Sequence, residues 1–143
     1  MPATDCPFQC VDRELPRLKD RAKVVLVDMH GEATSEKAAM GWYLDGRVAA
    51  VVGTHTHIPT ADERVLPRGT AFITDVGMCG AFDSVIGIDT GTSLPRFLTA
   101  MPTKFEVAKG NLWMNTVIID VDETRGVARS IERFRMTEAD LED

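Results

Sequence analysis

The sequence has few of the residues that mark several classes of protein. Its 16 lysine and arginine residues are outnumbered by 22 aspartate and glutamate residues, so the net charge is −6. Binding to a phosphate backbone needs a surplus of basic side chains, which excludes a nucleic-acid duplex as a partner. No apolar run approaches the roughly 18 residues of a membrane helix. The start, MPATDCPFQC, has neither the basic nor the apolar stretch of a signal peptide. We therefore expect a cytoplasmic protein that contacts no membrane.

Cysteine is also scarce, with only Cys6, Cys10 and Cys79. An odd number of cysteines in a chain without an export signal favours free thiols in a reducing compartment. No second pair of cysteines or histidines has zinc-knuckle spacing, so a structural zinc site is disfavoured. The length of 143 residues and the hydrophobic content of 44% are typical of one soluble domain with an apolar core.

Strand and helix patterns alternate along the chain, which predicts an α/β domain. The run KVVLVD over residues 23–28 predicts a strand that is buried on both faces, and VAAVV over 48–52 predicts a second buried strand. Between them we expect a helix from a cap at Thr34 or Ser35 to about Leu44. This order gives a βαβ unit with parallel strands. Elsewhere the patterns predict helices over 11–21 and 93–101, a strand over 70–75, a functional loop over 77–93, and a late β-hairpin over 112–121 and 127–134.

All three histidines of the chain lie between residues 30 and 57. His30 follows the first predicted strand, and His55 and His57 follow the second. Loops after neighbouring parallel strands open at the same edge of a sheet, where ligands bind in open α/β folds. In extended backbone, residues at i and i+2 share a side, so His55 and His57 can face one cavity. We therefore expect the three imidazoles to converge, with ring nitrogens about 4–8 Å apart.

Converging imidazoles favour a metal site, because neutral imidazole is a common ligand of zinc, iron and manganese. A serine hydrolase is the competing interpretation, but the chain has no G-x-S-x-G motif. Asp28 and Glu32 flank His30 and could orient its second ring nitrogen, or could serve only the strand end and the helix terminus. For Asp75 an ordinary turn at a strand end is the simpler interpretation, and the charge of Lys37 is expected on a solvated helix face.

Several segments resemble a known family. Residues 28–37, DMHGEATSEK, resemble the D-x-H-x-E-A-T-S-E-K signature of the YmdB-like bacterial metallophosphoesterases. Residues 53–57, GTHTH, resemble the closing G-x-H-x-H motif of calcineurin-like metallophosphoesterases, and the segments ATDCPF, TDVGM and DSVIG are also similar to the YmdB-like family. The resemblance implies one partial domain over residues 1–143, the carboxyl-terminal half of a four-layer αββα metallophosphoesterase sandwich.

The resemblance also implies a function. Such enzymes are phosphodiesterases that hydrolyse cyclic nucleotides, such as 2′,3′-cyclic nucleotides, with two divalent metal ions, of which iron is favoured over manganese or zinc. By resemblance, His30 and His55 hold one ion and His57 holds the other. Two metal ions can clamp the attacking and the leaving oxygen of a phosphate diester. The alternatives are a general phosphomonoesterase on the same scaffold and a non-catalytic remnant or binding module.

Part of the family pattern has no match in this chain. Family members are about twice as long, and their first half carries an aspartate, a bridging glutamate and an asparagine–histidine pair. These residues complete the metal ligands and supply the proton-donating histidine. The chain has no G-N-H triplet and no histidine before His30. We therefore expect no catalytic acid here, no activity of the chain alone, and a complementary amino-terminal half or self-association.

Overall fold

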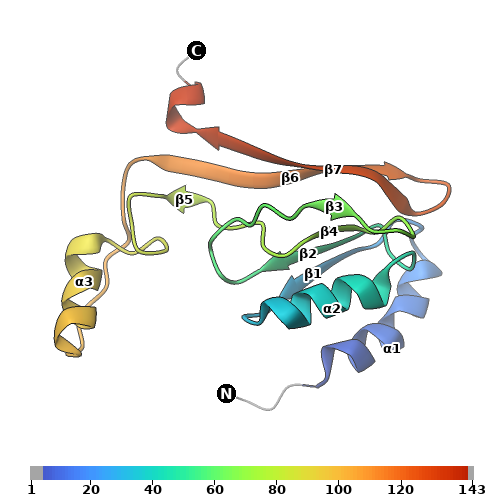
Figure 1. The fold of residues 1–143 in the computed structure, drawn as a ribbon, viewed down its shortest axis with the longest axis horizontal. Coiled ribbons are helices and arrows are strands. Elements are labelled where there is room, and N and C mark those ends of the chain that lie inside the picture. Colours follow the sequence, from blue (N-terminus) through green and yellow to red (C-terminus); the bar gives the residue numbers. More distant parts are fainter. Residues whose placement is uncertain (1–4, 142–143) are drawn as a thin grey trace.

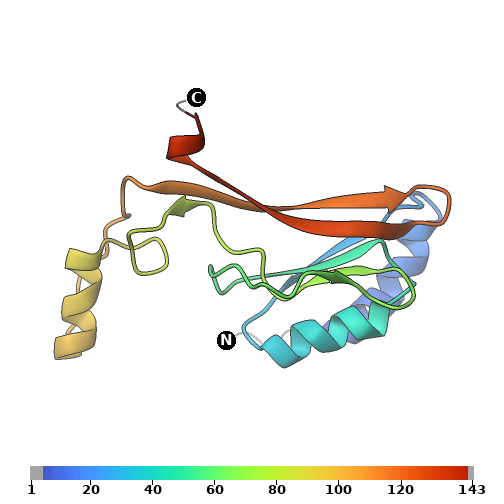
Figure 2. The ribbon, with the colours of Figure 1, turned by 45° about the horizontal axis from the view of Figure 1, so that its top comes forward.

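The computed structural model describes residues 5–141, which form two stacked sheets with α1 and α2 on the outer face of the first (Figures 1 and 2). The strand order is β1-β2-β4-β3 in the first sheet and β5-β6-β7 in the second. The elements are α1 (Pro7–Lys19), β1 (Leu26–His30), α2 (Thr34–Leu44), β2 (Ala50–Thr54), β3 (Arg64–Val65), β4 (Ala71–Ile73), β5 (Gly80–Ala81), α3 (Thr90–Thr99), β6 (Leu112–Asp122), β7 (Val127–Thr137) and a 3-10 helix (Glu138–Leu141).

The predicted βαβ unit is confirmed. β1 and β2 pair in parallel, with His30 opposite Thr54, and β4 pairs in parallel with the other side of β2. The ends of α2 agree with the prediction. The predicted cap is wrong, because Thr34 already lies in the first turn and Ala33, which cannot cap with its side chain, precedes the helix.

Two apolar cores hold the layers together. The first lies between the helices and the outer face of the first sheet, with Met40, Leu44 and Phe72 almost fully buried. The second lies between the sheets, where Ile73 of β4 belongs to the same cluster as Ile131 of β7. Burial of this apolar surface is the dominant favourable term in folding. The described residues thus form a helix layer and two sheets, in agreement with half of an αββα sandwich.

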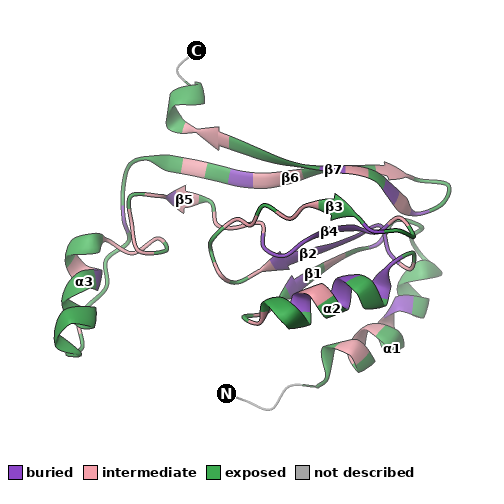
Figure 3. Ribbon diagram, viewed as in Figure 1, coloured by how far each residue is buried: buried purple, intermediate pink, exposed green. Residues whose placement is uncertain are grey.

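The prediction that the first strand is buried on both faces is wrong. Within residues 5–141, β1 forms the edge of its sheet and pairs only with β2. Met29 is buried in the core beneath the helices, whereas Leu26 is 56% exposed. Figure 3 shows the buried residues concentrated in the central strands β2 and β4. The apolar run therefore has one face that no described part of the chain covers.

The other elements differ from the predictions mainly at their ends. α1 begins at Pro7 rather than at residue 11, because proline fits the first turn of a helix. α3 begins at Thr90 rather than at residue 93, because the Asp89 side chain accepts a hydrogen bond from the Thr92 N–H and caps it. The late hairpin is confirmed as β6 and β7, and the three cysteines are free thiols. No helix within residues 5–141 is long and apolar enough to span a membrane.

At Gly53, β2 lies close against the segment that follows β4. A Cβ atom at Gly53 would lie 1.6 Å from the carbonyl oxygen of Thr74 and 2.9 Å from Cδ of Lys37. The fold could not accommodate this atom without a shift of the backbone. The lack of a side chain here therefore lets the loop after β2 lie against the segment after β4.

We expect Gly53→Ala to lower the free energy of unfolding by about 3 kcal/mol, because an added carbon in a filled interior forces the backbone to shift. Urea denaturation followed by circular dichroism measures this change. Gly31→Ala is the matched control, since its Cβ would meet only Cε of Met29, at 4.0 Å. Equal stability of the two variants would contradict the close approach at Gly53.

Candidate metal centre

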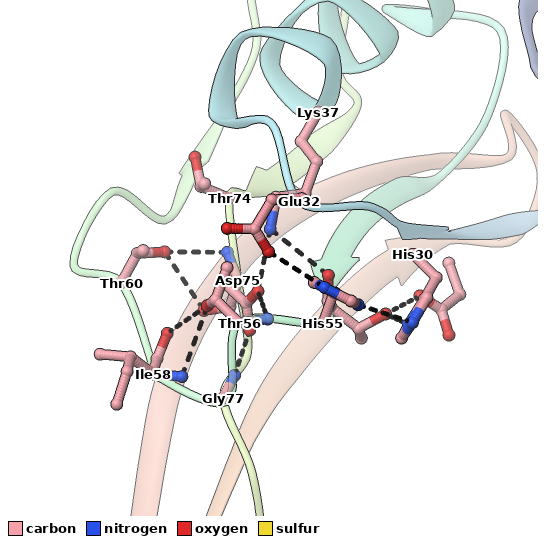
Figure 4. Close-up of polar contacts among 12 residues, drawn as sticks. His30, Glu32, Lys37, His55, Thr56, Ile58, Thr60, Thr74, Asp75 and Gly77 are labelled. Atoms are coloured by element: carbon pink, nitrogen blue, oxygen red, sulfur yellow. Dashed lines mark hydrogen bonds and ion pairs between the residues drawn. The ribbon is translucent and has the colours of Figure 1, made fainter. Parts of the chain in front are cut away.

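Two of the three histidines meet at the carboxyl edge of the first sheet. His30 is the last residue of β1, and His55 directly follows β2. Nε2 of His30 lies 3.0 Å from Nδ1 of His55, although the two residues are 25 positions apart (Figure 4). The separation is shorter than the expected one, because the parallel register places His30 opposite Thr54, the neighbour of His55.

His57 is held separately. Its Nδ1 donates to the carbonyl oxygen of Ile86, at 2.9 Å, in the loop between β5 and α3. The idea that His55 and His57 share a side in extended backbone is wrong, because their φ angles are 112° and 69°. Within residues 5–141, no three His, Cys, Asp or Glu side chains are arranged to hold a metal ion. The described part of the chain thus brings together a pair of histidines rather than a complete site.

Hydrogen bonds fix the tautomer of His30. Oγ1 of Thr54 donates to Oδ1 of Asp28 at 2.7 Å, and Nδ1 of His30 lies 3.0 Å from the same hydroxyl oxygen. A hydroxyl has one proton, and here it goes to Asp28, so Nδ1 of His30 must be the donor to Thr54. Nε2 of a neutral ring then keeps its lone pair. Asp28 therefore orients His30 through Thr54, and not by direct contact.

Glu32 orients His55 and not His30. The prediction that Glu32 could orient the second ring nitrogen of His30 is therefore corrected. Its Oε2 lies 3.0 Å from Nε2 of His55, which leaves Nδ1 of His55 facing His30. Two nitrogens that each lie about 2.0–2.1 Å from one ion, at nearly a right angle, are about 3 Å apart. The separation of 3.0 Å between His30 and His55 fits that arrangement. The spacing of these two nitrogens is therefore compatible with one shared cation, and the hydrogen bond of His57 within residues 5–141 uses Nδ1 and not Nε2.

A buried ion pair that the sequence does not reveal lies beside the histidine loop. Nζ of Lys37 is 2.9 Å from Oδ2 of Asp75, and the two side chains are 0% and 1% exposed. The predictions of a solvated Lys37 and an ordinary turn at Asp75 are both wrong. Lys37 passes beside Gly53, which has no Cβ to block it. One sequence signal could have revealed the pair. Lys37 lies in EATSEK and Asp75 lies in TDVGM, and both segments resemble the family.

The ion pair is also hydrogen-bonded to backbone. Nζ of Lys37 donates to the carbonyl oxygen of Thr54 at 3.3 Å. Oδ2 of Asp75 accepts from the N–H of Thr56 at 3.0 Å, and Oδ1 accepts from the N–H of Gly77 at 2.8 Å (Figure 4). Burial raises the pKa of the Asp75 carboxyl, but the hydrogen bonds from Lys37, Thr56 and Gly77 outweigh it, so the pKa lies below its ordinary value.

The DSVIG segment presents a carbonyl group to His57. The N–H of Gly87 donates to Oγ of Ser84 at 2.8 Å, which closes a tight turn. Ile86, inside this turn, has a φ of 48°. The turn directs the Ile86 carbonyl toward Nδ1 of His57. The segments DMHGEATSEK, TDVGM and DSVIG, which resemble the family, thus each supply a group that orients the histidines or the loop that carries them.

Residues 1–134 match the family described as YmdB-like protein, so the chain belongs to this family, as the motifs predicted. Among its curated relatives is the 2′,3′-cyclic-nucleotide 2′-phosphodiesterase of Bacillus subtilis (strain 168). The two are 48% identical over 134 residues, which cover 94% of this chain and 51% of that protein.

Two solved structures share the fold. A hypothetical protein from Thermus thermophilus superimposes with a TM-score of 0.88 at 43% identity, and the match covers 96% of this chain and 53% of that one. A phosphatase from Mycoplasma pneumoniae superimposes with a TM-score of 0.87 at 38% identity, covering 100% of this chain and 52% of the other. The chain therefore spans about half the length of these relatives.

Thr54→Val tests how Asp28 orients His30. The variant keeps the side-chain volume but removes the hydroxyl that lies between them, so we expect the neutral His30 ring to lose its preference for a proton on Nδ1. Ring ¹⁵N chemical shifts of the metal-free chain report this tautomer. We also expect Mn²⁺ affinity to fall about 10–100-fold. Thr99→Val is the control, since that hydroxyl donates to the carbonyl oxygen of Pro95 within α3, away from the histidine loop. An unchanged His30 tautomer in Thr54→Val would rule out this relay.

Acidification should destabilise the fold through Asp75. Its pKa is lower in the folded chain than the value of about 3.9 in an unfolded one. The stabilisation is therefore fully present above the unfolded value and is lost as the pH falls through the folded one. We expect the free energy of unfolding to fall more between about pH 5 and about pH 3 in the parent chain than in Lys37→Met/Asp75→Asn. Urea denaturation at each pH measures it, and equal losses would show that Asp75 contributes nothing.

Proposed function

We propose that the chain is the carboxyl-terminal half of a metal-dependent phosphodiesterase that hydrolyses cyclic nucleotides, such as 2′,3′-cyclic nucleotides. The observation that carries the proposal is the pair of facing nitrogens of His30 and His55, 3.0 Å apart. Asp28, acting through Thr54, and Glu32 orient this pair from the far side of each ring. The relative from Bacillus subtilis, which is 48% identical, bears the name of this activity.

The proposed cofactors are two divalent metal ions, with iron favoured and manganese or zinc as alternatives. When bound, they would supply a nucleophile at neutral pH and stabilise charge on the phosphate. His30 and His55 would hold one ion and His57 the other, because each ring has a nitrogen that its anchoring hydrogen bond leaves free. Three neutral imidazoles bring no negative charge and too few ligands, so the chain alone should bind metal weakly.

With metal ions bound as proposed, the histidines of this chain would have no free N–H to give to a leaving group. His30 uses Nδ1 to donate to Thr54, His55 uses Nε2 to donate to Glu32, and His57 uses Nδ1 to donate to Ile86. In each ring the other nitrogen is the proposed metal ligand. We infer that the general acid comes from a complementary segment, whichever polypeptide carries it.

Two uncovered surfaces support such a segment, which would correspond to the remaining length of the relatives. β1 is an edge strand within the described residues, with Leu26 56% and Val24 40% exposed beside it. On the hairpin β6–β7, Ile118 is 58% and Phe134 41% exposed. A strand added beside β1 would pair its open edge, and a helix layer over the hairpin would bury its apolar side chains. Both additions would complete the four-layer sandwich.

Complementation tests the proposal. The chain is mixed with a separately produced polypeptide that corresponds to the first half of the Bacillus subtilis relative, and hydrolysis of 2′,3′-cyclic AMP is measured with Mn²⁺ or Fe²⁺. We expect neither polypeptide to turn over substrate alone, the mixture to do so, and His57→Ala to reduce the rate to background. Glu123→Ala is the matched control, because Glu123 is an exposed polar residue in the turn between β6 and β7 and should leave the rate unchanged.

Each other outcome has a distinct meaning. Turnover by the 143-residue chain alone that His57→Ala abolishes would contradict its assignment as half of a catalytic unit. Association of the two polypeptides without turnover would favour a binding module or remnant. Faster hydrolysis of a phosphate monoester than of any diester would favour a general phosphomonoesterase.

A further inference from the structure

We propose that Lys37 and Asp75 form a clamp that holds His55 in a strained backbone conformation and so aims its imidazole at His30. The role of this clamp at a metal centre rests on the proposed function. The contacts that define the clamp are observed whether or not that function is correct. Lys37 and Asp75 are positioning residues in this proposal, because they act on the site only through the backbone around His55.

The strain lies at His55 itself. Its φ of 112° is in a region that residues with a Cβ atom rarely adopt. Such a conformation is unfavourable and persists only where the surrounding structure enforces it. If it relaxed to negative φ, the imidazole would turn away from His30 and Glu32. Something in the fold must therefore hold the backbone on both sides of this residue.

Lys37 and Asp75 hold the two peptide groups that flank His55. The Thr54 carbonyl belongs to the peptide group before His55, and it accepts from Nζ of Lys37 and from the N–H of Gly31, each at 3.3 Å. The Thr56 N–H belongs to the peptide group after His55, and it donates to Oδ2 of Asp75 at 3.0 Å. The orientations of these two groups determine φ and ψ of the residue between them. The ion pair, 2.9 Å long, ties both together.

The segment that carries Asp75 is itself fixed against the histidine loop. The N–H of Val76 donates to the carbonyl oxygen of Gly53 at 2.9 Å, and the N–H of Met78 donates to the carbonyl oxygen of His57 at 3.0 Å. These bonds lie on either side of the clamp along the loop. Asp75 therefore bonds to the histidine loop from a segment that is itself hydrogen-bonded to that loop on both sides.

Stability alone does not account for a fully buried ion pair. Apolar residues of similar volume in place of such a pair are often neutral or stabilising, because taking two charges out of water is unfavourable. An apolar pair, however, could not hydrogen-bond the peptide groups around His55. Directional bonding to the histidine loop is what Lys37 and Asp75 provide here and apolar side chains could not.

The test is the variant Lys37→Met/Asp75→Asn, which leaves no buried charge and almost the same volume. An amide has one acceptor atom where a carboxylate has two, so the N–H of Thr56 or of Gly77 loses its partner. In the metal-free chain we expect the nuclear Overhauser effect between the His30 and His55 rings to disappear, while amide resonances of the core stay in place. We also expect the Kd for Mn²⁺, measured by electron paramagnetic resonance, to rise at least about 10-fold.

Asp45→Asn is the matched control. Asp45 is another buried carboxylate, and it accepts from the N–H groups of Arg68 and Thr70 at 3.0 and 3.3 Å, among elements away from the histidine loop. We expect this variant to lose stability but to keep the contact between the rings of His30 and His55, and to keep the Kd for Mn²⁺. If both variants lost the contact between the two rings, lower stability alone would explain the loss, and the clamp would be overturned.

A folded double variant that keeps the ring contact would also overturn the clamp, whether or not the chain binds Mn²⁺. If the parent chain binds no Mn²⁺ through its histidines, the proposed function fails, and the ring contact still decides the clamp. If the double variant does not fold, an amide-to-ester replacement at Thr56 removes one of the two backbone N–H groups from which Asp75 accepts, the one beside His55, and leaves every side chain in place. If the clamp exists, this replacement weakens the contact between the rings of His30 and His55. A contact as strong as in the parent chain would overturn the clamp.

Discussion

The contact between Nζ of Lys37 and Oδ2 of Asp75, 2.9 Å long and excluded from water, is the interaction on which the histidine site depends. Parallel pairing of β1 and β2 decides that His30 and His55 emerge at one edge of the sheet. That pairing alone leaves the course of the loop after β2 undetermined. The ion pair joins α2 to the segment after β4 and bonds to the loop between them, so three separate stretches of chain combine to place one imidazole.

The arrangement of the elements could be predicted because apolar runs and their spacing report burial directly. KVVLVD and VAAVV indicate neighbouring parallel strands, and this topology is enough to predict that His30 and His55 meet. The prediction fails where the outcome depends on residues far away in the sequence. A lysine on a helix is normally solvated, and Lys37 is buried only because Gly53 leaves room and Asp75 supplies the opposite charge. The exposed face of β1 is a similar case, since an apolar run does not say what covers it.

Details inside the site depend on backbone conformations that the sequence gives no reason to expect. His55 and His57 both adopt positive φ, where glycine is favoured, so the prediction of an extended loop is reasonable for these residue types and is wrong. In this conformation of the loop, Glu32 contacts His55, and the Ile86 carbonyl accepts from His57. Residue type therefore identifies which ring nitrogens could bind a metal ion, but the fold determines which group each histidine contacts.

The close approach at Gly53 limits how the sequence can change over evolution. A side chain there would collide with the Thr74 backbone and displace Lys37. Loss of Lys37 alone would leave Asp75 as an uncompensated buried charge, and loss of Asp75 alone would do the same to Lys37. Substitutions at the two charged positions would therefore have to arise together to be tolerated, while any change at Gly53 would disturb both. The three positions form an epistatic unit, and we expect them to co-vary or stay fixed as a group among related chains.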